Sequence, residues 1–188
     1  MLIFKGSGIL KYQVFQKPPR REFAMKWINK RLTEVYDEDF LDSIEGLVDH
    51  GLVIELARCQ HHIQTSRFQH CVSVSYYCYR IAKRFDWDYK SAARAGLLHD
   101  FYHYDINSKE RVGGMKHLRS HPHLALKNAK ENFELNYLET DIISKHMWPI
   151  TLKLPKYKET WLIVGVDKFC ALLEFFKIQR NIIISRRL

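Results

Sequence analysis

Residues 66–85, "SRFQHCVSVSYYCYRIAKRF", decide the fold class of this chain. Apolar side chains recur at steps of four and three through Val74, Tyr77, Ile81 and Phe85, which is the period of one helix face. His70 lies one step earlier on the same face. Helical periodicity of this kind continues from residue 22 almost to the end, without an alternating strand series, so we expect an all-α fold.

The boundaries of the expected helices follow from this period and from capping residues. Thr65 or Ser66, Asp88 and Asn136 are suitable N-caps. Pro122 suits the first turn of its helix, which places His121 at the N-cap. The sequence predicts a single-domain helical bundle with helices over 22–34, 38–48, 51–60, 66–85, 89–101, 122–133, 137–147 and 158–178.

Length and local composition predict the domain organisation. A chain of 188 residues is typical of one domain with a real hydrophobic core. Residues 1–21 contain Pro18-Pro19 and two glycines, and we expect them to form a basic arm outside the main fold. The helical domain then occupies residues 22–188.

The composition is that of a water-soluble protein. Mean hydropathy is -0.33, and no apolar run approaches the roughly 20 residues of a membrane span. The N-terminus lacks the apolar stretch of a secretory signal. The four cysteines show no CxxC spacing and fall in helical patterns, which favours reduced thiols. A cytoplasmic location is therefore expected.

The net charge of +9 is concentrated at the ends of the chain. Residues 1–34 carry +6 and residues 177–188 carry +4, while residues 35–176 carry -1. Basic ends can bind polyanions or membrane surfaces, but they are more often solvated extensions. We therefore do not expect specific nucleic-acid binding.

Polar residues interrupt the apolar faces of four predicted helices. His70, His99 and His146 lie on the apolar faces of helices 66–85, 89–101 and 137–147, and Asp167 lies on that of helix 158–178. Small residues before His99 allow a neighbouring helix to approach closely. A single histidine here is usually a hydrogen-bonded core residue, whereas a buried carboxylate needs a compensating charge. Together these residues predict a metal site for Zn, Fe, Mn, Co or Ni.

This pattern resembles the H…HD…D motif of the HD-domain superfamily of metal-dependent phosphohydrolases. The matching residues are His70 in "RFQHCVSV", His99 and Asp100 in "LLHDFYHYD", and Asp167 in "GVDKFCALLE". The resemblance covers about residues 50–178, and it implies a helical hydrolase domain.

Some branches of the superfamily carry two further histidines and bind two metal ions. His121 in "SHPHLAL" and His146 in "ISKHMWP" fit these places, with His123 as the local alternative to His121. The resemblance implies that one ion is held by His70, His99, Asp100 and Asp167. The second ion would share Asp100 as a bridge and add His121 and His146.

The activity implied is cleavage of a nucleotide or other small phosphate ester by a metal-activated water. Asp100, His103 and Arg67 are the implied catalytic residues. Arg67 precedes His70 by one turn, and its guanidinium fork suits a phosphate. The alternative for each lysine near the ligands is that it is a solvated surface residue with no role in binding phosphate. The candidate phosphate-binding residues are Arg67, Lys116, Arg119, Lys145 and Lys168.

The chain departs from its relatives at His103, where several two-metal relatives carry lysine. A histidine there could act as a general acid, or the substrate could differ. The Gly-Tyr-Pro signature of the cyclic-dinucleotide phosphodiesterases is absent. The arrangement is closer to small HD hydrolases that cleave nucleotides, including diadenosine tetraphosphate.

Two other functions fit the same residues. Some HD-domain relatives use the same six ligands to hold two irons for oxidative cleavage with O2. A non-catalytic binding or regulatory module is the other alternative. In that case the basic arm and the tail "FFKIQRNIIISRRL" would engage a partner, RNA or a membrane, whereas the tail is otherwise the frayed end of the last helix.

Overall fold

The computed structural model describes residues 37–62, 65–103 and 114–185. The predicted arm over 1–21 and the predicted helix over 22–34 lie outside these residues. Within them the chain is mostly helical, which confirms the all-α prediction. The helices are α2 (Glu38–Ile44), α3 (Gly51–Glu55), η1 (Leu56–Arg58), α4 (Arg67–Arg84), α5 (Tyr89–Leu98), α6 (Met115–Asn132), α7 (Tyr137–Lys145) and α8 (Lys158–Ser185).

Two short strands precede α4, and the described residues form no other strand. Strands β1 (Gln60–His62) and β2 (Thr65–Ser66) form an antiparallel pair at the N-terminal end of α4. They do not change the helical class of the fold.

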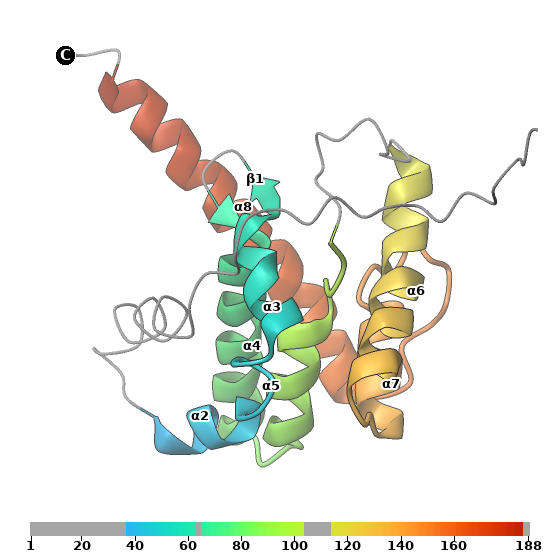
Figure 1. The fold of residues 1–188 in the computed structure, drawn as a ribbon. Helices are drawn as coiled ribbons and strands as arrows, with labels where there is room; N and C mark the ends of the chain where they lie inside the picture. The colour runs from blue at the N-terminus through green and yellow to red at the C-terminus, as the bar shows by residue number, and fades with distance from the viewer. Residues whose placement is uncertain (1–36, 63–64, 104–113, 186–188) are drawn as a thin grey trace, which may run out of the picture.

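Helices α4 and α5 form the centre of the bundle (Figure 1). Gly96 of α5 lies against Ser75 of α4, where an added Cβ would come within 2.8 Å of the Ser75 Cα. Ser75 Oγ also donates a hydrogen bond of 2.7 Å to the Ala93 carbonyl. The close approach expected from the small residues of this helix is therefore present, and it brings His99 near α4.

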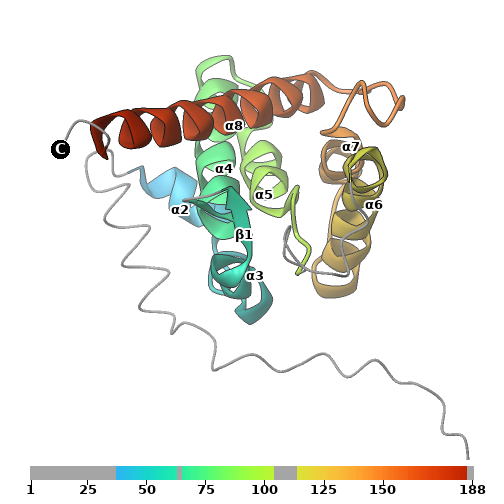
Figure 2. The ribbon, with the colours of Figure 1, turned by 90° about the horizontal axis from the view of Figure 1, so that it is seen from above.

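Helix α8 runs antiparallel to α4 across the bundle (Figure 2). The Lys158 ammonium lies over the Trp87 ring, beyond the C-terminal end of α4, while Glu174 reaches His70 near its N-terminal end. Helix α7 packs against α5 and α8, and α6 packs against α7. The interior of the bundle is thus surrounded by helices α4, α5, α7 and α8.

The predicted N-caps agree with the structure. The Ser66 and Asn136 side chains accept hydrogen bonds from the backbone N–H groups three residues later, in capping boxes with Gln69 and Glu139. Asp88 accepts a hydrogen bond from the Ser91 backbone N–H. These caps fix where α4, α7 and α5 begin.

The predicted start of helix 122–133 is wrong. Helix α6 begins at Met115, so Pro122 lies inside the helix and His121 is not its N-cap. The residues "MKHLRSH" that form the first two turns are mostly polar, and they therefore lack the apolar period that reveals a helix. Beside the proline, Ser120 Oγ and His121 Nδ1 donate to the His117 carbonyl.

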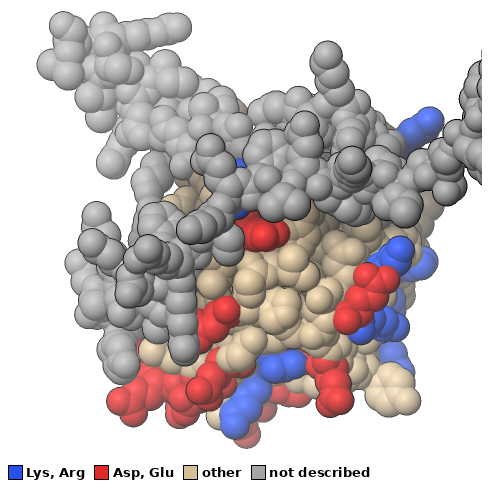
Figure 3. Space-filling model, viewed as in Figure 1, with Lys and Arg blue, Asp and Glu red and all other residues tan. Residues whose placement is uncertain are grey.

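The described residues form no helix that could span a membrane, and their surface carries charges of both signs. Among the described helices, none combines the length and apolarity needed to cross a bilayer. On the face seen in Figure 1, acidic and basic groups lie together along the lower and right-hand edges around a largely uncharged centre (Figure 3). This distribution agrees with the nearly balanced charge of the central sequence.

Candidate metal centre

Five helices bring the predicted ligands together in the interior. His70 comes from α4, His99 and Asp100 follow the end of α5, His121 comes from α6, His146 follows α7, and Asp167 comes from α8. The four histidines and Asp100 are buried, and the Asp167 side chain is 13% exposed. Each residue therefore faces inward, as the helical periodicity predicted for His70, His99, His146 and Asp167.

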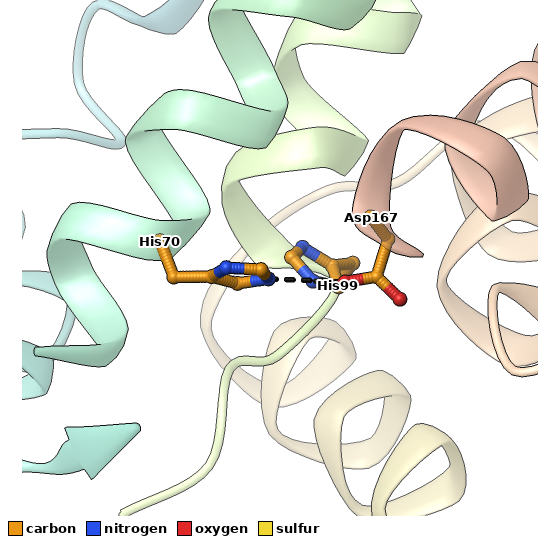
Figure 4. Close-up of side chains that lie close together, drawn as sticks. All are labelled: His70, His99 and Asp167. Atoms are coloured by element: carbon orange, nitrogen blue, oxygen red, sulfur yellow. Dashed lines mark hydrogen bonds and ion pairs between the residues drawn. The ribbon is translucent and has the colours of Figure 1, made fainter. Parts of the chain in front are cut away.

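A first group of ligands consists of His70, His99 and Asp167 (Figure 4). His70 Nε2 lies 3.0 Å from Asp167 Oδ1, and His99 Nε2 lies 3.6 Å from the same oxygen. Their ligand atoms are all within 4.8 Å of one another, so that one ion could contact all three.

A second group shares His99 and adds Asp100 and His146. Asp100 Oδ1 lies 3.6 Å from His146 Nε2 and 3.3 Å from His121 Nε2. His121 Nε2 is also 2.9 Å from His146 Nε2. The two groups therefore share His99, and Asp100, the next residue in the chain, belongs to the second group.

Hydrogen bonds orient each ligand ring in the same sense. His99, His121 and His146 place Nδ1 within 2.8–3.1 Å of the backbone carbonyls of Gly96, His117 and Ile143. A carbonyl only accepts, so Nδ1 carries a proton, and in the neutral ring Nε2 keeps its lone pair. The three Nε2 atoms therefore point into the site, where the neutral rings could bind a metal ion.

His70 is oriented by a carboxylate instead. Its Nδ1 lies 3.1 Å from Glu174 Oε1, and its Nε2 faces Asp167. Burial lowers the pKa of His70, but the hydrogen bonds that its ring donates to Asp167 and Glu174 raise it to about 10. The two carboxylates thus favour positive charge at this position.

The other ionisable groups are tuned in opposite directions. Burial would raise the pKa of Asp167, but the imidazoles of His70 and His99 hold it well below its usual value. Burial and the neighbouring His99 and His121 lower the pKa of His146 to about 3, and burial also lowers that of His121. Asp167 is therefore a carboxylate, and His146 and His121 are neutral imidazoles.

These residues fit one or two divalent ions. His121 and His146 turn two nitrogen lone pairs toward one another at 2.9 Å, and only a shared proton or a cation makes such a contact favourable. Neutral imidazoles together with carboxylates are the donors that Zn, Fe, Mn, Co and Ni take.

Glu174 contacts the candidate ligand His70, and the sequence did not assign it to the site. It lies two turns after Asp167 on α8 and contacts His70 on α4. Its position on the Asp167 face was visible in the sequence, but its contact with a residue 104 positions away was not. A carboxylate on the second nitrogen of a ligand histidine fixes the ring and raises its basicity.

Arg67 lies on the predicted face but within the protein interior. It is fully buried, and its Nη1 donates a hydrogen bond of 2.8 Å to the Tyr102 carbonyl. Its guanidinium also stacks on the Tyr102 ring, 3.7 Å from the centroid. Arg67 thereby fixes the segment that follows the His99-Asp100 pair.

His103 is exposed at the end of the same segment. Its Nε2 donates a hydrogen bond of 2.8 Å to the Leu52 carbonyl, and its ring lies against Phe101. Among the contacts of the described residues, His103 makes none with a predicted ligand. The structure therefore does not bring His103 together with Asp100 in the site.

The predicted phosphate-binding cations divide into two groups. Lys145 pairs with Asp141, and Lys168 Nζ donates to the Val164 carbonyl. Lys116 and Arg119 are exposed on α6, the helix that carries His121. His123, the alternative to His121, is also exposed on α6, whereas His121 is buried.

His117 was missed by the sequence reasoning. It is buried, its ring lies 5.0 Å from that of His121, and its Nε2 is 3.5 Å from the Tyr102 hydroxyl. His117 sits one turn before His121, but the helix expected from residue 122 left it outside any element. Recognition that α6 begins at Met115 would have placed both histidines on one face.

The helical fold and the H…HD…D set of side chains together define a class of helical domain whose buried His and Asp residues could hold a metal ion. The family model described as "HD domain" matches residues 67–164, just over half of the 188 residues. The chain belongs to the HD domain family, whose members are usually metal-dependent hydrolases that bind divalent metals. No curated protein and no solved structure matches the chain.

Proposed function

We propose that this protein is a phosphohydrolase that holds two divalent metal ions and cleaves a nucleotide or another small phosphate ester. The carrying observation is that two groups of candidate ligand atoms share His99, and that Asp100 belongs to the second group. His70 and Asp167 complete one group, and His121 and His146 complete the other. These six residues would hold the two ions, with Asp100 shared between them as the resemblance to the family implies.

When bound, two such ions lower the pKa of water and clamp the oxygens of a phosphoryl group. The protein residues act by position. The backbone carbonyls and Glu174 hold the imidazoles with Nε2 inward, and burial keeps bulk water from the ligands. Asp100 Oδ1 lies close to the Nε2 atoms of His121 and His146, so a carboxylate oxygen stands at the centre of this group of side chains.

The substrate phosphates need positive charge from protein residues as well as from the metal ions. We assign this role to Lys116 and Arg119, because both are exposed on the helix that supplies His121. Arg67 and Lys145 already bond within the protein, which favours structural roles for them. Lys168 is exposed on α8, with its ammonium on a carbonyl of its own helix, and we do not assign it to the phosphate. The proposal leaves the proton donor for the leaving group unassigned, because His103 hydrogen-bonds Leu52.

The test is a screen of phosphate mono- and diesters with Mn, Co or Ni added to the purified chain. We expect hydrolysis that Asp100→Asn lowers by at least about a hundredfold, since it removes a shared ligand. Asp42→Asn, on the exposed surface of α2, is the matched control and retains full activity. Activity that survives Asp100→Asn contradicts the proposal, as do two irons with oxygen uptake and no hydrolysis.

A further inference from the structure

Helix α8 has one face that packs into the protein and an opposite face that is exposed. Its inner face carries Asp167 and Glu174 into the metal centre, together with the buried Ile163 and Cys170. Its opposite side is apolar and exposed, which is unusual because a surface helix normally turns polar residues outward. We call this side the outer face of α8; it comprises Trp161, Phe169, Leu172, Leu173, Phe175 and Phe176.

The outer face forms one continuous stripe. Phe169, Leu172 and Phe176 follow one another at steps of three and four residues along one side of the helix, and Trp161 lies on the same side eight residues before Phe169. Phe175 and Phe176 are 53% and 59% exposed, and half of the exposed large hydrophobic residues in the described chain belong to this stripe. The end of α8 also projects beyond the other helices (Figures 1 and 2).

Positive charge accompanies the stripe. Lys168 is exposed between Trp161 and Leu172 on the same side. The last twelve residues of the chain, 177–188, carry four Lys or Arg and no acid. A segment that combines aromatic and leucine residues with lysine and arginine has the composition that binds at a lipid headgroup interface.

We propose that the outer face of α8 binds an anionic membrane surface. The helix lies in the plane of the interface, with its phenylalanines and leucines between the headgroups and its basic residues on lipid phosphates and carboxylates. The inner face keeps Asp167 in the metal centre. This interaction is independent of the proposed hydrolase activity.

The charges favour a membrane over a second copy of the chain. Two α8 helices paired through this face would bury both copies of Lys168 among apolar side chains, and burying a charge without an opposite partner is costly. At an anionic surface the same charges are attracted, and the Lys168 stem can extend its ammonium to the headgroups.

The test is co-sedimentation of the full chain with phosphatidylcholine vesicles with and without phosphatidylserine. We expect binding to the phosphatidylserine vesicles that falls steeply as salt is added. A Phe175→Ser/Phe176→Ser variant is expected to bind at least about tenfold more weakly. Phe85→Ser is the matched control, because Phe85 is equally exposed but lies at the end of α4, and it leaves binding unchanged.

Each other outcome contradicts the proposal. Absence of binding to anionic vesicles, or binding that the double substitution does not weaken, removes the outer face as the contact. A dimer by light scattering that the double substitution dissociates, without vesicle binding, assigns the face to a second copy. Circular dichroism confirms that each variant retains its helices.

Discussion

A ligand histidine differs from a core histidine in where its two nitrogens point. His99, His121 and His146 each give Nδ1–H to a backbone carbonyl one turn earlier and aim Nε2 inward. The carbonyl of the histidine's own helix thus selects the tautomer. Local helix geometry therefore prepares the site before any ion arrives.

Glu174 performs the same task for His70 with a carboxylate. Replacing Glu174 by alanine removes the acceptor for Nδ1–H, and we expect metal affinity to fall about 10- to 100-fold. Glu174→Gln keeps an acceptor oxygen and loses less. Competition with a chromophoric chelator measures both affinities, and Glu45→Ala on the exposed surface is the control. Equal affinity in Glu174→Ala and the unsubstituted protein refutes this role.

At the scale of elements, the contact between α4 and α5 determines the distance between His70 and His99. Gly96 permits this contact because its missing Cβ leaves room for the Ser75 backbone. The His70 and His99 rings consequently lie 5.4 Å apart, centre to centre. Helix packing thus controls ligand spacing.

Gly96→Ala tests this packing. A Cβ 2.8 Å from the Ser75 Cα forces the helices apart, and we expect a loss of about 1–3 kcal/mol in the free energy of unfolding. Gly165→Ala in α8 is the control: no atom lies within 4 Å of its added Cβ, and alanine favours the helix. Urea unfolding distinguishes the two; equal stabilities would mean that the close contact is absent.

Asp141 joins α7 to the beginning of α8. It accepts hydrogen bonds from Thr160 Oγ1 at 2.7 Å and from the Lys156 backbone N–H, and it pairs with Lys145. Burial raises the pKa of Asp141, but Lys145, Thr160 and the Lys156 N–H lower it below 3.8 overall. The carboxylate is therefore the form that stabilises the fold.

This pKa shift predicts how stability depends on pH. A depressed pKa in the folded state contributes stability above the ordinary pKa, and the contribution is lost as pH falls through the folded value. Asp141→Asn is therefore expected to destabilise at pH 7 and to differ less from the unsubstituted protein at pH 3. Urea unfolding at both values checks this, with Asp42→Asn as control. A difference that stays constant with pH would contradict the assignment.

At the scale of the whole molecule, the sequence predicted the helical class and most helix positions, because apolar periodicity reports them directly. It also singled out Asp167, since a carboxylate on an apolar face is costly without a partner. It could not give the start of α6, whose first turns are polar, and so it missed His117. Contacts between distant residues, such as His70 with Glu174 and His103 with Leu52, depend on helix packing that periodicity does not contain.

The bundle as a whole makes the site, because no single helix carries a complete set of ligands. The His99-Asp100 pair follows α5 at the centre, and the outer helices supply a partner on either side. The central claim is therefore that two ions share this pair.

Elemental analysis of the metal-loaded chain tests that claim most directly. The account predicts two divalent ions per chain, and one ion in either His70→Ala or His146→Ala, since each substitution disables one ligand group. His123→Ala, on the exposed face of α6, retains both ions. One ion or none in the unsubstituted chain, or two ions that persist in both ligand variants, would contradict it.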